Sequence, residues 1–228
     1  VLVLPGLLAG DGSTRPLRRI LRDLGYQVHG WRLGRNIGPT AKAVAGMAER
    51  LEDLDRRYHA PVSVIGWSLG GIFARGIGRR APSAVRQVIT LGSPFRLTNH
   101  NQTRAGAAFQ RFSHLHVERA PVPLQLETEP LSVPATSIYS KYDGVVAWQA
   151  CLDLRSPTAE NIAVIGSHFG FGHNPAVIWA IADRLAQPQG EWAPFRPPAV
   201  LRPLFPRPET LRECSAPNHV QSTLPDTN

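Results

Sequence analysis

Residues 64–78 have the sequence "VIGWSLGGIFARGIG", in which an apolar run meets a helical pattern at a serine. The five residues from Gly66 to Gly70 match the pattern G-x-S-x-G. Glycines two residues before and after a serine permit a sharp turn between a strand and a helix, because a side chain at either place would collide with neighbouring backbone. The pattern also occurs by chance in loops, but here it follows a predicted strand and precedes a predicted helix. The stretch therefore predicts Ser68 as a nucleophile exposed at the N-terminus of a helix.

The rest of the chain alternates short apolar runs with longer helical patterns. Strands are predicted at residues 1–4, 26–33, 62–66, 85–92, 133–140 and 160–166. Helices are predicted after an N-cap at Ser13, from about residue 41 to Tyr58, after Gly70, and from about Pro175 to Ala186. Continuous apolar strands separated by helices are typical of a parallel sheet that is covered on both faces. We therefore expect an α/β fold with a mostly parallel sheet flanked by helices.

The chain has 228 residues, which suits a single domain with one sizeable core. We expect that core to occupy residues 1–186. The connection from about residue 96 to 132 is too long for an ordinary loop and has one weakly helical piece, so a small lid is predicted there. Residues 187–228 are rich in proline and lose periodicity, which predicts an extended or disordered tail.

A serine needs a base to become a good nucleophile, and the base needs an acid to orient it. After an elbow of this kind, the acid precedes the histidine along the chain. Asp143 follows the fifth predicted strand in "YDGVV", although Asp-Gly is also a favoured turn dipeptide. His168 follows the last predicted strand by two residues, whereas His173 stands beside Asn174 at the predicted start of the last helix. We therefore expect Asp143 as the acid and His168, in preference to His173, as the base.

Negative charge that develops on the substrate must be met by backbone N–H groups, which form an oxyanion hole. Leu69 directly follows the serine and is expected to supply one of them. Leu7, in the loop "PGLLAGDG" after the first predicted strand, is expected to supply the other. This loop lacks the glycine patterns of phosphate-binding loops. The substrate pocket is expected to include Leu8, Trp67, Phe95 and His173.

These segments together resemble the α/β-hydrolase family over residues 1 to about 186. The resemblance rests on "LPGLLAG" as the oxyanion loop, "GWSLGG" as the nucleophile elbow, "YDGVV" as the acid turn and "GSHFG" as the base loop. More narrowly, the chain is similar to bacterial esterase and lipase-like members. The resemblance implies Ser68 as nucleophile, His168 as general base and then acid, Asp143 as its orienting partner, and no cofactor.

Two features depart from the family pattern. Pro5 stands where the oxyanion loop usually has a histidine, although the donor there is a backbone group. Family members also usually carry strands before the one at residues 1–4, so we expect that upstream residues and N-terminal strands are missing and that the sheet keeps a bare edge at its second strand.

Composition and charge indicate which kinds of binding partner and which location to expect for the protein. The formal net charge is +8, but the arginines are scattered and no basic stripe is interleaved with aromatic residues, so no nucleic-acid partner is expected. No apolar run approaches the ~20 residues of a transmembrane helix, and no leader opens the chain, so a cytoplasmic location is expected. The histidines have no acidic or cysteine partners at the spacing of metal ligands, so no metal site is predicted. The two cysteines do not form the pattern of a disulfide framework, so no disulfide is predicted.

The sequence thus predicts a serine hydrolase that cleaves carboxylic esters through an acyl-enzyme. The lid segment is apolar enough to bind an acyl chain, through Phe95, Leu97, Phe109 and Phe112, and it therefore favours a lipid-like or medium-chain ester. Two alternatives remain open at this point. The same triad could catalyse acyl transfer, thioester hydrolysis or perhydrolysis, or the chain could be a non-catalytic binding protein on a hydrolase fold.

Overall fold

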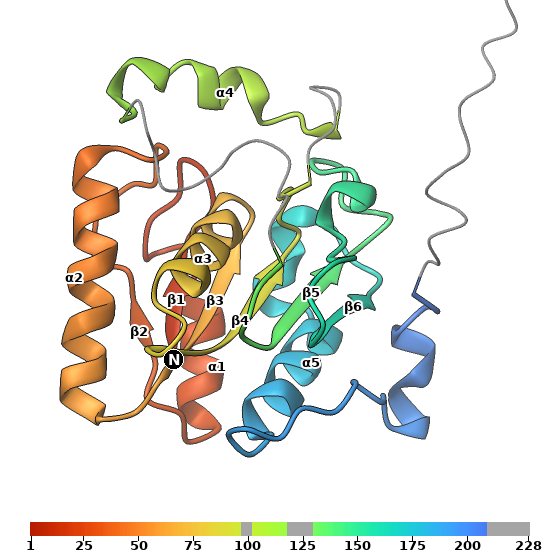
Figure 1. Cartoon of the computed structure of the whole chain (residues 1–228). Helices are drawn as coiled ribbons and strands as arrows, with labels where there is room; N and C mark the ends of the chain where they lie inside the picture. Colours follow the sequence, from red (N-terminus) through yellow and green to blue (C-terminus); the bar gives the residue numbers. More distant parts are fainter. Residues whose placement is uncertain (97–101, 118–129, 209–228) are drawn as a thin grey trace, which may run out of the picture.

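The computed structural model describes residues 1–96, 102–117 and 130–208. Within these ranges six strands form one open, entirely parallel sheet in the order β2-β1-β3-β4-β5-β6 (Figure 1). The strands are β1 (Leu2–Leu4), β2 (His29–Gly30), β3 (Val62–Trp67), β4 (Val85–Leu91), β5 (Ala135–Tyr139) and β6 (Ala159–Ala163). Each lies within or beside a predicted strand. The predicted α/β fold class is confirmed.

The helices lie where the hydrophobic spacing predicts them. They are α1 (Arg15–Asp23), α2 (Ala41–Tyr58), α3 (Leu69–Arg80), α4 (Gly106–Gln110) and α5 (Pro175–Ala186). One detail of the prediction is wrong: the N-cap of α1 is Thr14 instead of Ser13. The Ser13 hydroxyl donates instead to the Gly10 carbonyl oxygen, 2.8 Å away, in the turn before the helix. No helix in the described part of the chain is both long and apolar enough to cross a membrane.

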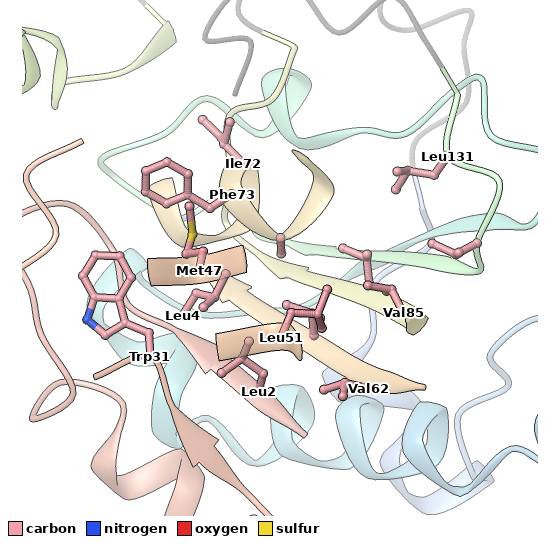
Figure 2. Packing of buried hydrophobic residues seen from close by; sticks show 14 of the residues in the cluster. Leu2, Leu4, Trp31, Met47, Leu51, Val62, Ile72, Phe73, Val85 and Leu131 are labelled. Carbon is pink, nitrogen blue, oxygen red and sulfur yellow. The ribbon is translucent and has the colours of Figure 1, made fainter. Parts of the chain in front are cut away.

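The two faces of the sheet are covered by different helices, and alternate residues of each strand serve different faces. Leu2 and Leu4 of β1 belong to a buried cluster with α2 and α3 (Figure 2). Val3, between them, belongs to a second cluster with α1 and α5. The central strands are therefore apolar throughout, as a sheet buried on both faces requires.

The proline-rich segment after α5 is extended over residues 187–208, with a 3-10 helix at Ala199–Leu204. It packs against the edge strand β6 and α5. Arg184 of α5 donates to Glu160 of β6 (2.5 Å) and to the Ala193 carbonyl oxygen (2.6 Å). The Phe195 N–H donates to the second Glu160 carboxylate oxygen at 2.6 Å. The remainder of the predicted tail, residues 209–228, lies outside the described residues.

A buried ion pair joins α3 to the loop before β6. Arg75 and Asp153 lie 2.8 Å apart, and each side chain is 3% exposed. The Arg75 guanidinium also lies 4.0 Å from the centre of the Phe95 ring. Burial alone would raise the pKa of Asp153, but Arg75 and hydrogen bonds from Ser156 and the Arg155 N–H outweigh it and hold that pKa below its usual range. Asp153 is therefore ionised at neutral pH.

We expect Asp153→Asn to lower the free energy of unfolding at pH 7 by about 3 kcal/mol, because the buried Arg75 charge loses its partner. A carboxylate with a lowered pKa stabilises the fold above its unfolded pKa, and this stabilisation is lost as the pH falls through the folded value. The difference between wild type and variant should therefore shrink below about pH 4. Urea unfolding at pH 7 and pH 3 measures it, and an equal difference at both values would contradict the assignment.

Candidate active site

Ser68 occupies the turn between β3 and α3. Its backbone has φ 53° and ψ −120°, a strained conformation for a residue with a side chain. Its N–H donates to the Leu91 carbonyl oxygen at 2.8 Å, and the residue is 8% exposed. A Cβ on Gly66 would lie 2.2 Å from the Gly70 carbonyl oxygen, and one on Gly70 would lie 2.5 Å from the Leu4 carbonyl oxygen. The two glycines therefore allow the backbone segments beneath Ser68 to pack closely against one another.

Asp143 lies in the turn after β5 and is 4% exposed. Its Oδ1 accepts two backbone hydrogen bonds, from Val145 (2.9 Å) and Val146 (2.6 Å). These bonds fix the carboxylate and leave Oδ2 for a further partner. The Asp-Gly turn that the sequence suggests thus orients the carboxylate inward.

His168 supplies that partner. Its Nδ1 lies 2.7 Å from Asp143 Oδ2, and its backbone N–H donates to the Asp143 carbonyl oxygen at 2.9 Å. A carboxylate has only acceptors, so the Nδ1 carries the hydrogen, and in the neutral ring the lone pair is on Nε2. The ring is 4% exposed, and the rings of Phe169 and Phe171 lie edge-on to it with centroids 5.6 and 6.2 Å away. The imidazole is therefore held in the tautomer that a general base needs.

The serine and the His–Asp pair both lie at the end of β4. Leu91 accepts the Ser68 N–H, and the next residue, Gly92, lies against the pair. A Cβ on Gly92 would lie 2.8 Å from Asp143 Oδ2 and 3.2 Å from His168 Nδ1. Trp67, directly before the serine, donates its Nε1 hydrogen to the His168 carbonyl oxygen at 3.1 Å. The structure therefore brings the three predicted residues to one strand end.

Gly92 is a residue of this site that the sequence interpretation missed. It stands at the end of a predicted strand, where a glycine has no chemical signal of its own. Its φ is +52°, and a Cβ there would also lie 2.5 Å from the Phe171 ring. The close approach of strand, carboxylate and imidazole therefore requires glycine at this position.

We expect Gly92→Ala to lower kcat about 10²-fold, because the new methyl group would push the imidazole and carboxylate apart. Steady-state kinetics on purified variant measure it. Gly25→Ala is the matched control, since Gly25 has φ +93° and nothing within 4 Å of its Cβ position. It should carry at least as much backbone strain as Gly92→Ala and keep wild-type kcat. Equal effects of the two changes would contradict the argument.

The predicted oxyanion donors flank the serine. Leu69 is the first residue of α3, so its N–H has no partner within the helix. Leu7 lies in the loop after β1, and no hydrogen bond among the described residues uses its N–H. A Cβ on Gly6 would lie 3.2 Å from Ser68 Cβ and 3.9 Å from Ser68 Oγ, so this loop lies against the serine. Both N–H groups therefore remain as candidate donors at Ser68.

The four predicted pocket residues have different surroundings. Leu8 is 42% exposed, next to the candidate oxyanion donor. Trp67 is half-buried and bonded to the base loop, whereas His173 is exposed at the end of the 3-10 helix His168–His173. Phe95 is 3% exposed and lies beneath Arg75 within the core, so its ring is a structural contact in this conformation.

Part of the predicted lid, residues 102–117, crosses the same end of the sheet (Figure 1). At one end it pairs with the acid turn: the Arg104 N–H donates to Val145 (2.9 Å), and Gln102 accepts from Ala147 (2.8 Å). At the other end the His116 ring donates to the Ile37 carbonyl oxygen at 2.8 Å. The lid segment is thus attached to loops on both sides of the candidate site.

No family model matches the sequence, and no curated protein matches it. Several solved structures do match this chain in fold. A pyrethroid hydrolase, PytH, is 16% identical with a TM-score of 0.59 over 83% of this chain and 98% of that one. A thermophilic esterase from Thermogutta terrifontis is 15% identical with a TM-score of 0.57 over 81% and 88%. A structure described with the metagenome-derived lipolytic enzymes LipS and LipT is 15% identical with a TM-score of 0.58 over 81% and 90%. The chain has the α/β-hydrolase fold.

Proposed function

We propose that this chain, on its α/β-hydrolase fold, is a serine hydrolase that cleaves carboxylic esters. The observation that carries the proposal is the buried His168–Asp143 pair, 2.7 Å from Nδ1 to Oδ2, packed against the strand end that also holds Ser68. Such a pair beside a strained serine turn is the arrangement that nucleophilic acyl chemistry needs. The solved structures with the same fold include an esterase and lipolytic enzymes, which supports hydrolysis of a small-molecule ester.

In the proposed mechanism, Ser68 Oγ attacks the ester carbonyl carbon while His168 Nε2 accepts the hydroxyl proton. The carbonyl oxygen becomes an oxyanion, which the N–H groups of Leu69 and Leu7 stabilise. Asp143 holds the imidazole and stabilises the imidazolium. Collapse of the intermediate expels the alcohol, which takes the proton from His168, and leaves an acyl-Ser68 ester. Water then attacks this ester with His168 as base, which releases the acid and restores the serine.

The first test uses a fluorophosphonate probe, which reacts with an activated serine and needs no knowledge of the substrate. We expect the wild type to be labelled, the label to map to Ser68, and Ser68→Ala to abolish both labelling and turnover of p-nitrophenyl esters. Ser13→Ala is the control, because Ser13 is an exposed serine far along the chain from the elbow. Labelling that survives Ser68→Ala would overturn the assignment.

The second test addresses the substrate. We propose a lipid-like or medium-chain acyl group, because Phe109 of the lid segment is partly buried against the apolar cluster on the α2 and α3 face. A series of p-nitrophenyl esters from short to long chains, run beside acyl-CoA thioesters, should give the highest kcat/KM with a medium-chain ester. A preference for acyl-CoA would favour a thioesterase or acyltransferase on the same triad.

A further inference from the structure

Asn36, in the loop between β2 and α2, is fully buried and bonded to the loop after β1. Its side-chain Nδ2 donates to the Pro5 carbonyl oxygen at 2.8 Å. Its backbone oxygen accepts from the Leu8 N–H at 2.6 Å, and its backbone N–H donates to Ala9 at 2.8 Å. Its Oδ1 accepts from the Gly38 N–H at 3.2 Å. One residue therefore holds the candidate oxyanion loop at three points.

These bonds fix the two peptide groups on either side of the Leu7 N–H. The Pro5 carbonyl belongs to the peptide group before it, and the Leu8 N–H belongs to the peptide group after it. Between them, the Gly6 carbonyl oxygen accepts from the Ala9 N–H at 3.2 Å. In a trans peptide the C=O and N–H point in opposite directions, so the Leu7 N–H points away from that turn. Its direction follows from this bond and from the two neighbouring peptide groups, which Asn36 holds.

The loop also holds a strained residue. Leu8 has φ +61°, a conformation that side-chain-bearing residues keep only where their surroundings impose it. The contact that fixes its N–H is the Asn36 carbonyl oxygen. The hydrogen bond from the Asn36 amide to Pro5 helps to hold the loop in this strained conformation. Without that bond, the loop could relax and the peptide group that carries the Leu7 N–H could rotate.

We propose that Asn36 is a positioning residue for the oxyanion hole: it keeps the Leu7 N–H aimed at the oxyanion of the tetrahedral intermediate that forms on Ser68. This inference rests on the proposed function and adds a residue to it. No hydrogen bond among the described residues joins Asn36 to Ser68 or His168, so Asn36 acts through the loop. Loss of the Asn36 side chain should therefore destabilise the transition state, in which negative charge develops, and leave substrate binding unchanged.

The test is Asn36→Asp. This change keeps the size and the acceptor for Gly38, but replaces the donor to Pro5 with an oxygen that repels the carbonyl. We expect kcat for a p-nitrophenyl ester to fall about 10²-fold, with KM changed less than about threefold. A trifluoromethyl ketone, which forms an oxyanion on Ser68, should bind about 10²-fold more weakly, whereas a non-cleavable ether analogue should bind as to wild type.

Asn161→Asp is the matched control. Its amide also donates to a backbone carbonyl, that of Asp153 at 2.7 Å, but it lies on the edge strand β6. Its kcat should stay near the wild-type value whatever its Tm. Should Asn36→Asp not fold, Asn36→Ala is measured in the same way, because it leaves room for a water in place of the amide.

The outcomes separate the two proposals. A folded wild type that neither reacts with the fluorophosphonate nor turns over esters would overturn the proposed function and this inference with it. An active wild type with unchanged kcat and ketone affinity in the Asn36 variants would overturn the inference alone. So would a lower Tm with wild-type kcat per folded molecule, or failure of both variants to fold, since either result assigns Asn36 to stability.

Discussion

Replacing Asp143 by asparagine should lower kcat for ester hydrolysis about 10⁴-fold, with little change in Tm. The reason lies in the two backbone N–H groups of Val145 and Val146, which both donate to Oδ1. They force the amide oxygen of the new residue to that side and turn its NH₂ group toward His168. The imidazole must then accept at Nδ1, so its hydrogen moves to Nε2. A histidine with Nε2–H cannot take the proton of the Ser68 hydroxyl.

Steady-state kinetics and the rate of fluorophosphonate labelling measure this effect. Asp23→Asn is the control, because Asp23 is an exposed carboxylate at the end of α1, away from the site. It should react like wild type. Activity of Asp143→Asn within tenfold of wild type would show that the carboxylate does not set the state of the base, and the proposed mechanism would fail.

The second large effect concerns stability. Gly66→Ala should lower the free energy of unfolding by about 5 kcal/mol or more, because the new Cβ would meet only backbone. It would lie 2.2 Å from the Gly70 carbonyl oxygen and 2.4 Å from the Gly71 Cα. Backbone atoms of a central strand and a packed helix cannot move aside as a flexible side chain can. We expect Tm to fall by at least about 10 °C, together with loss of activity.

Thermal unfolding followed by circular dichroism measures this change. Gly12→Ala is the matched control, since nothing lies within 4 Å of the Cβ position of Gly12 and its φ is not in the left-handed region. Its Tm should lie within about 2 °C of wild type. If the Tm of Gly66→Ala equalled that of the Gly12→Ala control, the turn at Ser68 would not need glycine for steric reasons.

Much of the fold follows from local sequence. The apolar run 62–66, the G-x-S-x-G pattern and the helical spacing after it predict β3, the elbow and α3, because each depends on residues close together along the chain. The same holds for α5, where Asn174 caps the helix as predicted by accepting from the Ala176 N–H at 2.9 Å. The sequence predicts the cap of α1 one residue too early, since serine and threonine both favour that position and the preceding turn selects between them.

Some residues of the candidate site can likewise be predicted from the sequence, and others cannot. Ser68, Asp143 and His168 each follow a predicted strand, and parallel strands end at one edge, so sequence alone suggests that they meet. The apolar side chain of Phe95 predicts a place in the pocket, and its packing under Arg75 cannot be inferred from residues 20 positions apart. Gly92 and Asn36 gave no local signal at all, because their importance comes from neighbours in other loops.

The sequence by itself determined the order of the elements, the turn that carries the serine, and the strand ends at which an acid and a base could stand. These depend on periodicity and on backbone conformations that only a few residues adopt. Tertiary structure alone decided which side chain meets each loop: the His168 imidazole on Asp143, and the Asn36 amide on Pro5. Such contacts join segments that are distant along the chain, and they form only when the sheet has fixed where each loop begins.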